Sequence, residues 1–209
     1  MGVTERKQRE KVYREAAILE AAKKVFLEKG IVVATIDDIA AEAELGKGTL
    51  YRFYRSKEDI LLAINEQASR EMHQHFSQAV AGPGTGLDKI LRFNRSYYEF
   101  VVANPVYFGF IAFFESPLTS TKPATVYETS NAIHLLVIEL LELGKQDGSV
   151  RADLKSDLIA NTIWASSYGM MQFIVSKGAY LTEERHVDLD ELFATFLAML
   201  ENALRVAKK

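Results

Sequence analysis

The sequence predicts an all-α protein, and three observations support this fold class. Apolar residues recur at intervals of three and four along most of the chain, which is the spacing of one buried helix face. Only 4 of the 209 residues are proline, and the clearest break is the glycine-rich stretch at 81–86. No segment alternates polar and apolar residues between hairpin turns, as half-buried strands do.

Start and stop signals then place the helices. Gly30 ends a first helix at 7–29, while Thr35 and Ser56 are N-cap residues for helices at 36–43 and 57–80. A short helix at 47–54 lies between these two. Further helices are expected at 87–103, 106–115, 124–143, 156–176 and 189–208, with a loop at 116–123. The chain would therefore comprise an N-terminal domain at 1–57, a long connecting helix at 58–81 and a larger helical domain at 82–209.

Composition excludes several classes of protein. No apolar run reaches the ~18 residues of a spanning helix, and the charged N-terminus lacks the apolar stretch of a signal peptide. We therefore expect a cytoplasmic protein without a membrane partner. Cysteine is absent, which excludes disulfides, thiolate zinc sites and cysteine nucleophiles. His73 and His75 cannot share a helix face, so we expect no metal site, and we expect no cofactor.

The charge of the chain is unevenly distributed. The overall net charge is −3, yet residues 1–57 hold 12 Lys and Arg against 9 Asp and Glu. The first quarter is therefore at +3 and the remainder at −6. An anionic partner would be met at the N-terminal end, although a solvated basic helix is an alternative explanation of the charge alone.

The segment 35–57 carries the functional signal. Two short helices joined by a tight turn at 44–46 predict a helix-turn-helix, whose second helix can enter the major groove of DNA. Ile39, Leu45 and Leu50 would be buried, which leaves small or basic residues free at the start of the second helix. Exposed backbone N–H groups there favour phosphate. Tyr51 and Arg52, one turn further on, can reach phosphate or a base edge.

The same segment closely resembles the DNA-binding domain of the TetR/AcrR family of bacterial transcriptional regulators. The residues that carry the resemblance are Thr35, Ile39-Ala40, Ala43, Lys47-Gly-Thr-Leu-Tyr51 and Ser56-Lys-Glu-Asp59. It implies that Thr35 caps its helix and binds phosphate and that Lys57 holds the DNA backbone. The DNA-binding residues would then be Thr35, Gly46, Lys47, Gly48, Thr49, Tyr51, Arg52 and Lys57, with Lys7, Arg9 and Lys11 as further phosphate contacts. Glu44 departs from the family pattern, which usually has glycine in the turn, and Phe53 replaces a polar aromatic residue or histidine.

The larger domain is rich in aromatic residues. In the family this domain binds a small effector, so a cavity here would suit a hydrophobic or aromatic molecule. The candidate ligand-binding residues are Phe93, Tyr97, Phe100, Tyr107, Phe110, Phe113, Phe114, His134, Trp164, Tyr168 and Met171. Aromatic stripes at helical spacing are more often plain core than a ligand site, and both interpretations stay open.

The last two helices carry the argument for a homodimer. Apolar residues on the last helix cover an arc wider than the roughly 100° that one contact face needs. The resemblance implies that the apolar residues beyond one contact face belong to a four-helix dimer interface. The alternative is that the last helix is a central helix within its own chain. The candidate interface residues are Ala165, Gly169, Phe193, Phe196, Leu197, Leu200 and Leu204.

Together these features predict a ligand-responsive repressor rather than an enzyme. It would bind a palindromic operator in double-stranded DNA as a homodimer and release it when a small hydrophobic or aromatic effector binds. No paired histidines, Ser-His-acid pattern or phosphate-binding loop favours catalysis. Two alternatives remain: a helical enzyme or lipid-binding protein that uses the aromatic cavity, and an activator of the same fold without a ligand.

Overall fold

A computed structural model describes residues 3–115 and 124–206 and confirms the all-α fold class. The predicted loop at 116–123 lies outside the described residues. Within them the structure has no strand, and one isolated bridge pairs Val150 with Arg205. The helices are α1 (Val3–Lys29), α2 (Ile36–Glu42), α3 (Lys47–Leu50), α4 (Lys57–Ala81), α5 (Gly86–Ala103), α6 (Pro105–Glu115), α7 (Ala124–Gln146), α8 (Ser156–Glu183) and α9 (Leu189–Leu204).

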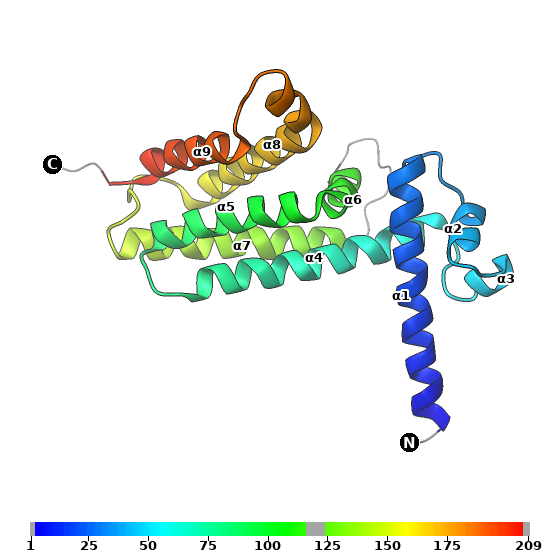
Figure 1. The fold of residues 1–209 in the computed structure, drawn as a ribbon. Helices are drawn as coiled ribbons and strands as arrows, with labels where there is room; N and C mark the ends of the chain where they lie inside the picture. The colour runs from blue at the N-terminus through cyan, green and yellow to red at the C-terminus, as the bar shows by residue number, and fades with distance from the viewer. Residues whose placement is uncertain (1–2, 116–123, 207–209) are drawn as a thin grey trace.

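The helices form two groups that meet along α4. Figure 1 shows α1 standing across one end of a bundle that contains α4, α5 and α7, with α8 and α9 packed on the far side of α5. Helices α2 and α3 lie beside α1, at the end of the molecule away from this bundle. We call α1 to α3 with residues 57–64 of α4 the head, and the remaining helices the body. The single helix α4 therefore belongs to both.

Among the helix ends that differ from the prediction, three are explained by local and tertiary contacts. α3 ends at Leu50, since the N–H groups of Arg52 and Phe53 bond to carbonyls three residues back, Phe53 N to Leu50 O at 2.9 Å. α8 continues to Glu183, because Gly178 is covered by Leu189 of α9 and does not break the helix. α9 stops at Leu204, whose carbonyl accepts the N–H of Arg151 at 2.9 Å beside the isolated bridge.

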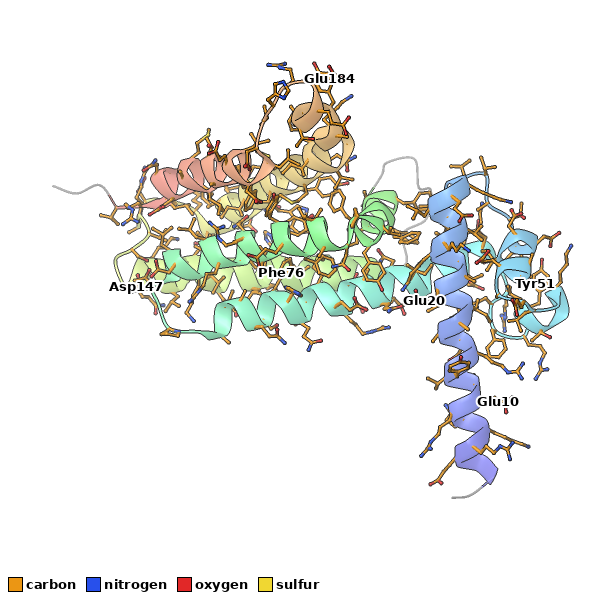
Figure 2. The ribbon with its side chains drawn as sticks, viewed as in Figure 1. Glu10, Glu20, Tyr51, Phe76, Asp147 and Glu184 are labelled. Atoms are coloured by element: carbon orange, nitrogen blue, oxygen red, sulfur yellow. The ribbon has the colours of Figure 1, made fainter. Side chains whose placement is uncertain are left out.

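The body core combines buried aromatic side chains on α4, α5, α6 and α9 with a larger number of aliphatic residues, including four on α7, and with partly buried rings on α8. Tyr97 is 2% exposed, and its ring stacks on Trp164 with centroids 6.2 Å apart. Phe76 of α4 lies 4.3 Å from Phe93 of α5, measured between ring centroids. Large rings remove much apolar area from water, so these aromatic side chains contribute strongly to the stability of the body. Figure 2 shows Phe76 inside the bundle.

Helix α6 belongs to both the body core and the head core. It follows Asn104 at a bend of 107° from α5 and crosses the junction beside α1. Phe108 is buried in the body cluster. Phe110 and Phe114 are buried with head residues instead, and Phe110 meets Phe26 of α1 edge to face at 5.7 Å. Side chains on opposite sides of this short helix thus enter different cores.

This placement corrects part of the predicted ligand site. Phe110 and Phe114 contribute to the head core, and Phe113 is partly buried against the same core. They do not face the aromatic cluster of the body. Helical spacing indicated that these residues were buried, but it could not indicate which of two cores each would join.

None of the described helices is by itself both long and apolar enough to span a membrane. Only α5 and α6 taken together reach these limits, and they are bent by 107° at their junction.

The start of α5 is fixed by a close backbone approach to α7. A Cβ atom at Gly86 would lie 2.1 Å from the Gly144 nitrogen and 2.6 Å from the Leu140 carbonyl oxygen. The Gly86 N–H also donates to Asp147 Oδ2 at 2.7 Å. Glycine at position 86 is therefore a packing requirement, because the atoms in the way belong to backbone that cannot rotate aside.

We predict that Gly86→Ala lowers the free energy of unfolding by about 1–3 kcal/mol, as overpacking does in a close-packed interior. The matched control is Gly109→Ala on α6, where a Cβ atom meets nothing within 4 Å. Urea denaturation followed by circular dichroism measures both. Equal stability of the two variants would show that α5 and α7 are not held at this distance.

Candidate nucleic-acid interface

Local capping bonds set the start of α2. Thr35 Oγ1 accepts the N–H of Asp38 at 3.2 Å and donates to Asp38 Oδ2 at 2.7 Å, while the Thr35 N–H donates to the same carboxylate at 2.9 Å. This is the predicted capping box, with Asp in the place of the usual Glu. Lys29, and then Thr35, bond to the Asp38 carboxylate and lower its pKa to about 2. The Thr35 hydroxyl thus serves the helix cap.

The turn between α2 and α3 contains a strained residue. Glu44 has φ +54°, in the left-handed region that favours glycine. The turn is closed by backbone bonds from Glu44 N to Ala41 O and from Leu45 N to Ala40 O. The family that this segment resembles usually has glycine at this position, because glycine adopts a positive φ without steric cost.

The residues at the start of α3 are exposed around one buried anchor. Leu50 is fully buried in the head core, while Gly46, Lys47 and Gly48 are exposed. Cβ atoms at both glycines would meet nothing within 4 Å, so the backbone is open to close approach. Figure 2 shows Tyr51, which is 50% exposed, on the outer side of α3 away from the body.

The cation at the start of α3 has a partner within the head. Lys47 Nζ forms an ion pair with Asp37 Oδ2 of α2, and both side chains are more than half exposed. Exposed pairs contribute little to stability and exchange partners easily. Lys47 can therefore bind an external anion when its ion pair with Asp37 is broken.

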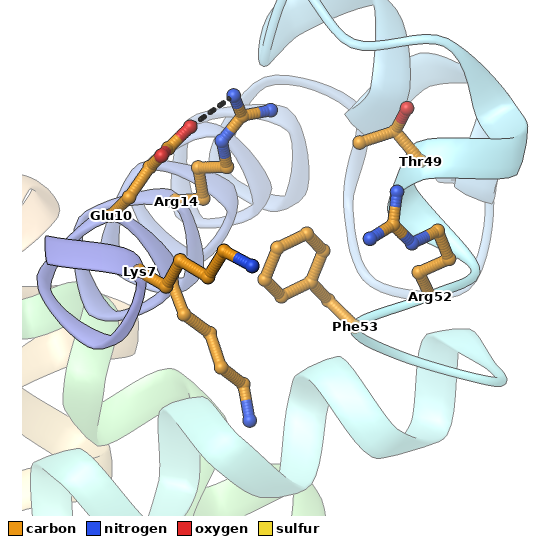
Figure 3. A pocket seen from close by; sticks show the side chains of 7 residues that line it. Lys7, Glu10, Arg14, Thr49, Arg52 and Phe53 are labelled. Carbon is orange, nitrogen blue, oxygen red and sulfur yellow. Dashed lines mark hydrogen bonds and ion pairs between the residues drawn. The ribbon is translucent and has the colours of Figure 1, made fainter. Parts of the chain in front are cut away.

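A groove separates the first half of α1 from α3 and the turn after it. Its volume is about 540 Å³, and it is lined by Lys7, Glu10, Lys11, Arg14, Thr49, Arg52 and Phe53. Figure 3 shows the Lys7 side chain reaching from α1 toward the Phe53 ring, with Arg52 on the other side of the groove. Arg14 and Phe53 were not among the predicted DNA-binding residues. The spacing of Lys7, Lys11 and Arg14 on one helix face was the signal that could have indicated this wall.

Lys57 has a different role from the predicted phosphate contact. Its ammonium donates to the carbonyl oxygens of Ile31, Val32 and Ala34 at 2.9, 3.1 and 2.9 Å. An ammonium group has three donors, and all three are used here. Lys57 therefore ties the start of α4 to the loop between α1 and α2 and holds the head together.

Comparison with known proteins agrees with this geometry. Residues 18–64 match the model of the bacterial regulatory proteins of the tetR family, a span that starts in the packed part of α1 and ends in α4. Helix-turn-helix regulators recur among the curated relatives. This segment belongs to the tetR family of bacterial regulatory proteins.

The relatives match this chain at higher identity over a short segment than over most of its length. An uncharacterized HTH-type transcriptional regulator of Bacillus subtilis, YhgD, is 39% identical over 67 residues, which are 32% of this chain and 35% of that protein. The HTH-type transcriptional repressor KstR2 of Mycolicibacterium smegmatis is 24% identical over 158 residues, 73% of this chain and 77% of that protein. The solved structure of KstR2 of Mycobacterium tuberculosis is 16% identical, with a TM-score of 0.71 over 93% of this chain and 96% of that one.

Several predicted effector-binding residues meet between α5 and α8. Tyr97, Trp164 and Tyr168 form a stacked series, and Phe108 of α6 lies 5.7 Å from the Tyr168 ring. A buried polar pair lies on the same two helices, where Ser167 Oγ donates to Asn94 Oδ1 at 2.5 Å. Phe93, Phe100, Tyr107 and Met171 belong to or border the same cluster.

His134 does not join this group. Its Nε2 lies 3.0 Å from Asp157 Oδ1, near the start of α8 and toward the surface. This contact between α7 and α8 places His134 apart from the aromatic cluster, so its predicted role in ligand binding has no support in this arrangement. Among the side chains that the structure describes, no group of three or more His, Asp or Glu residues is placed to hold a metal ion.

The predicted dimer residues divide into two sets. Phe193, Leu197 and Leu204 are at most 6% exposed and pack into the body core of their own chain. Phe196 and Leu200 are partly buried against that core. The structure therefore corrects the assignment of Phe193, Leu197 and Leu204, because α9 packs on α5 and α8 of its own chain, whereas Phe196 and Leu200 keep part of their surface exposed.

An exposed stripe on α8 contains the other set. Ala165 and Gly169 are exposed, and Phe173, one further turn along, is 45% exposed. Leu158 lies on the same helix face and is 59% exposed, and Met199 of α9 is 68% exposed. Small residues between large apolar ones leave room for a second helix to approach closely.

We predict that Lys57→Met destabilises the head without changing its electrostatic contact with DNA. Loss of three charged hydrogen bonds should lower the free energy of unfolding by about 1–3 kcal/mol. The salt dependence of duplex binding should stay as in the wild type. Urea denaturation and fluorescence anisotropy in a salt series measure the two quantities, with the exposed Lys155→Met as control. A salt slope smaller by about 1 with unchanged stability would restore the phosphate role.

Proposed function

We propose that this TetR-family protein is a cytoplasmic repressor that binds a palindromic operator as a homodimer and releases it when a small hydrophobic or aromatic effector binds. The observation that supports DNA binding is the exposed start of α3, which is anchored by the buried side chain of Leu50. Gly46, Lys47 and Gly48 offer open backbone and one cation at a position where side chains can read a major groove. Several relatives are named as repressors, which supports repression.

The body supports the effector part of the proposal. Stacked rings of Tyr97, Trp164 and Tyr168 suit a flat apolar molecule, and the Asn94–Ser167 pair offers hydrogen bonds to orient it. The related solved structure is described as a ketosteroid transcriptional regulator, and a ligand of that apolar kind agrees with these side chains. An effector that binds more tightly to one arrangement of the heads shifts the population toward it, to the extent of that difference in affinity.

The exposed stripe on α8 supports the homodimer. Two copies of this face, with Gly169 between Ala165 and Phe173, would form an isologous contact with α9 alongside. A twofold axis there would place two heads on one face of DNA. Half-sites of the operator would then lie about one helical turn, ~34–36 Å, apart.

Substitutions on α3 test the DNA-binding part. Lys47→Ala and Tyr51→Ala should each weaken binding by about 1–3 kcal/mol to a duplex that the wild type selects from a random library. Fluorescence anisotropy with the full chain measures the affinity. Lys155→Ala removes the same charge from the exposed surface of the body and should leave the affinity unchanged. Wild-type affinity in both α3 variants would contradict the assignment of α3 as the recognition helix.

A charge on the α8 stripe tests the dimer. Phe173→Glu should convert the dimer into monomers at micromolar concentration, because two carboxylates would be buried close together across the axis. Since Phe173 is 45% exposed in one chain, the monomer should keep its fold. Sedimentation velocity measures the change, with Val102→Glu, at a 53% exposed position on α5, as control. A Phe173→Glu protein that remains dimeric would place the interface elsewhere.

A further inference from the structure

The head is joined to the body along two routes. Helix α4 belongs to both groups, and long helices bend gently along their length, so α4 alone would let the head tilt against the body. The second route lies away from the α4 axis, where α6 crosses the junction beside α1 (Figure 1). The angle of the head therefore depends on the contacts between α1 and α6.

Two neighbouring pairs of side chains join α1 to α6. Phe26 of α1 meets Phe110 of α6 edge to face. Three residues earlier on each helix, Lys23 meets Tyr107, and residues three apart are neighbours on a helix surface. Burial of the rings holds the helices together without fixing their angle, because the hydrophobic effect is non-directional. A hydrogen bond weakens steeply as its angle changes, so the polar pair is the part that can fix the orientation.

Lys23 is a largely buried cation. Its side chain is 11% exposed, and its Nζ donates to the Tyr107 hydroxyl and to Glu20 Oε1, each at 2.7 Å. The ammonium also lies 4.7 Å from the centroid of the Tyr107 ring. Burial disfavours the charged form, but the bonds to Glu20 and Tyr107 outweigh it and raise the pKa of Lys23. The bond from Lys23 to Tyr107 is therefore charge-assisted.

The Tyr107 hydroxyl connects this cation to α4. It lies 3.5 Å from Glu71 Oε1, an oxygen that also accepts from Gln67 Nε2 at 3.0 Å. A phenol can accept and donate at once, so the ammonium binds the oxygen lone pair while the proton points to the carboxylate. The 3.5 Å contact is weak, and its effect is to orient the hydroxyl toward Lys23. One hydroxyl thus links α1 of the head with α6 and the body part of α4.

The ring of Tyr107 also lies between the two groups of helices. Of the apolar side chains that the structure describes, it is the one that packs against both the head core and the body core. It stacks on Phe100 of α5 with ring centroids 6.4 Å apart. Its chain neighbour Phe108 lies 5.7 Å from Tyr168 in the proposed effector site. Tyr107 therefore borders that site, with its polar end directed at α1 and α4.

We propose that Tyr107 is a positioning residue that sets the angle of the head on the body, and with it the spacing of operator half-sites that the protein accepts. This proposal rests on the proposed function, in which a twofold axis between two bodies relates two heads. One base pair inserted between half-sites moves them apart by ~3.4 Å and rotates one against the other by ~35°. A head held by the Tyr107 hydroxyl does not follow this change, whereas a head held by α4 and ring contacts alone tilts to meet it.

Removal of single hydroxyl groups tests the proposal. Tyr107→Phe removes the hydroxyl and keeps the ring. The matched control, Tyr98→Phe, removes a hydroxyl that donates to Asp190 Oδ1 at 2.6 Å between α5 and α9, inside the body. Fluorescence anisotropy measures affinity for the duplex that the wild type selects from a random library, for a copy with one base pair inserted at its centre, and for one half-site alone. Sedimentation velocity checks that each variant remains dimeric.

The ratio of affinities for the selected and the lengthened duplex is the decisive quantity. A hydrogen bond to a charged group can shift an equilibrium about tenfold, so this ratio should fall by about tenfold in Tyr107→Phe. The affinity for one half-site should stay as in the wild type. Lys23→Met removes the other partner of the same bond and should lower the ratio to a similar extent, while Tyr98→Phe should keep the wild-type ratio.

Three results would contradict the proposal. A wild-type ratio in both Tyr107→Phe and Lys23→Met would remove the positioning role, and so would a wild type that binds both duplexes equally. An equal fall in Tyr98→Phe would replace it with a general loosening of the chain. A wild type that selects no duplex would instead overturn the proposed function, and the positioning role with it.

Discussion

The burial of Leu50 is the interaction on which the DNA-facing surface depends. Helix α3 has only four residues, far below the length at which a helix is stable alone in water. It keeps its place because Leu50 is fully buried against head residues such as Ile39 of α2 and Ile60 of α4. The exposed residues around Leu50 can be small or charged because they are not needed for this packing.

The head core in turn depends on the body. Phe110 and Phe114 of α6 complete it, while Phe108 of the same helix is buried among body aromatics. Lys23 of α1 adds a polar link, since its Nζ donates to the Tyr107 hydroxyl of α6 at 2.7 Å and lies 4.7 Å from that ring's centroid. A shift of α6 would therefore disturb both cores. Under the proposed function, this shared packing gives effector binding in the body a physical route to the head.

Local signals made the head predictable from the sequence. The capping residues Thr35 and Ser56 bond as expected, because such bonds span only three residues. Long-range neighbours were not predictable in the same way. Periodicity indicated that Phe110 and Phe193 were buried but not against which helices, and charge indicated that Lys57 was a cation but not that three carbonyls surround it. Helical spacing could indicate one wall of the groove but not the groove itself, since its two walls come from positions about 40 residues apart that the packing of α1 on α2 and α4 brings together.

Salt-dependent duplex binding by the wild-type protein tests the central claim most directly, namely that the head is a DNA-binding surface. Affinity would be measured from low to physiological salt for a selected duplex and for a scrambled duplex of equal length. We predict tighter binding to the selected duplex at every salt concentration, with a slope of about −0.9 for each phosphate contact. Equal affinity for both duplexes, or affinity that does not change with salt, would contradict the account.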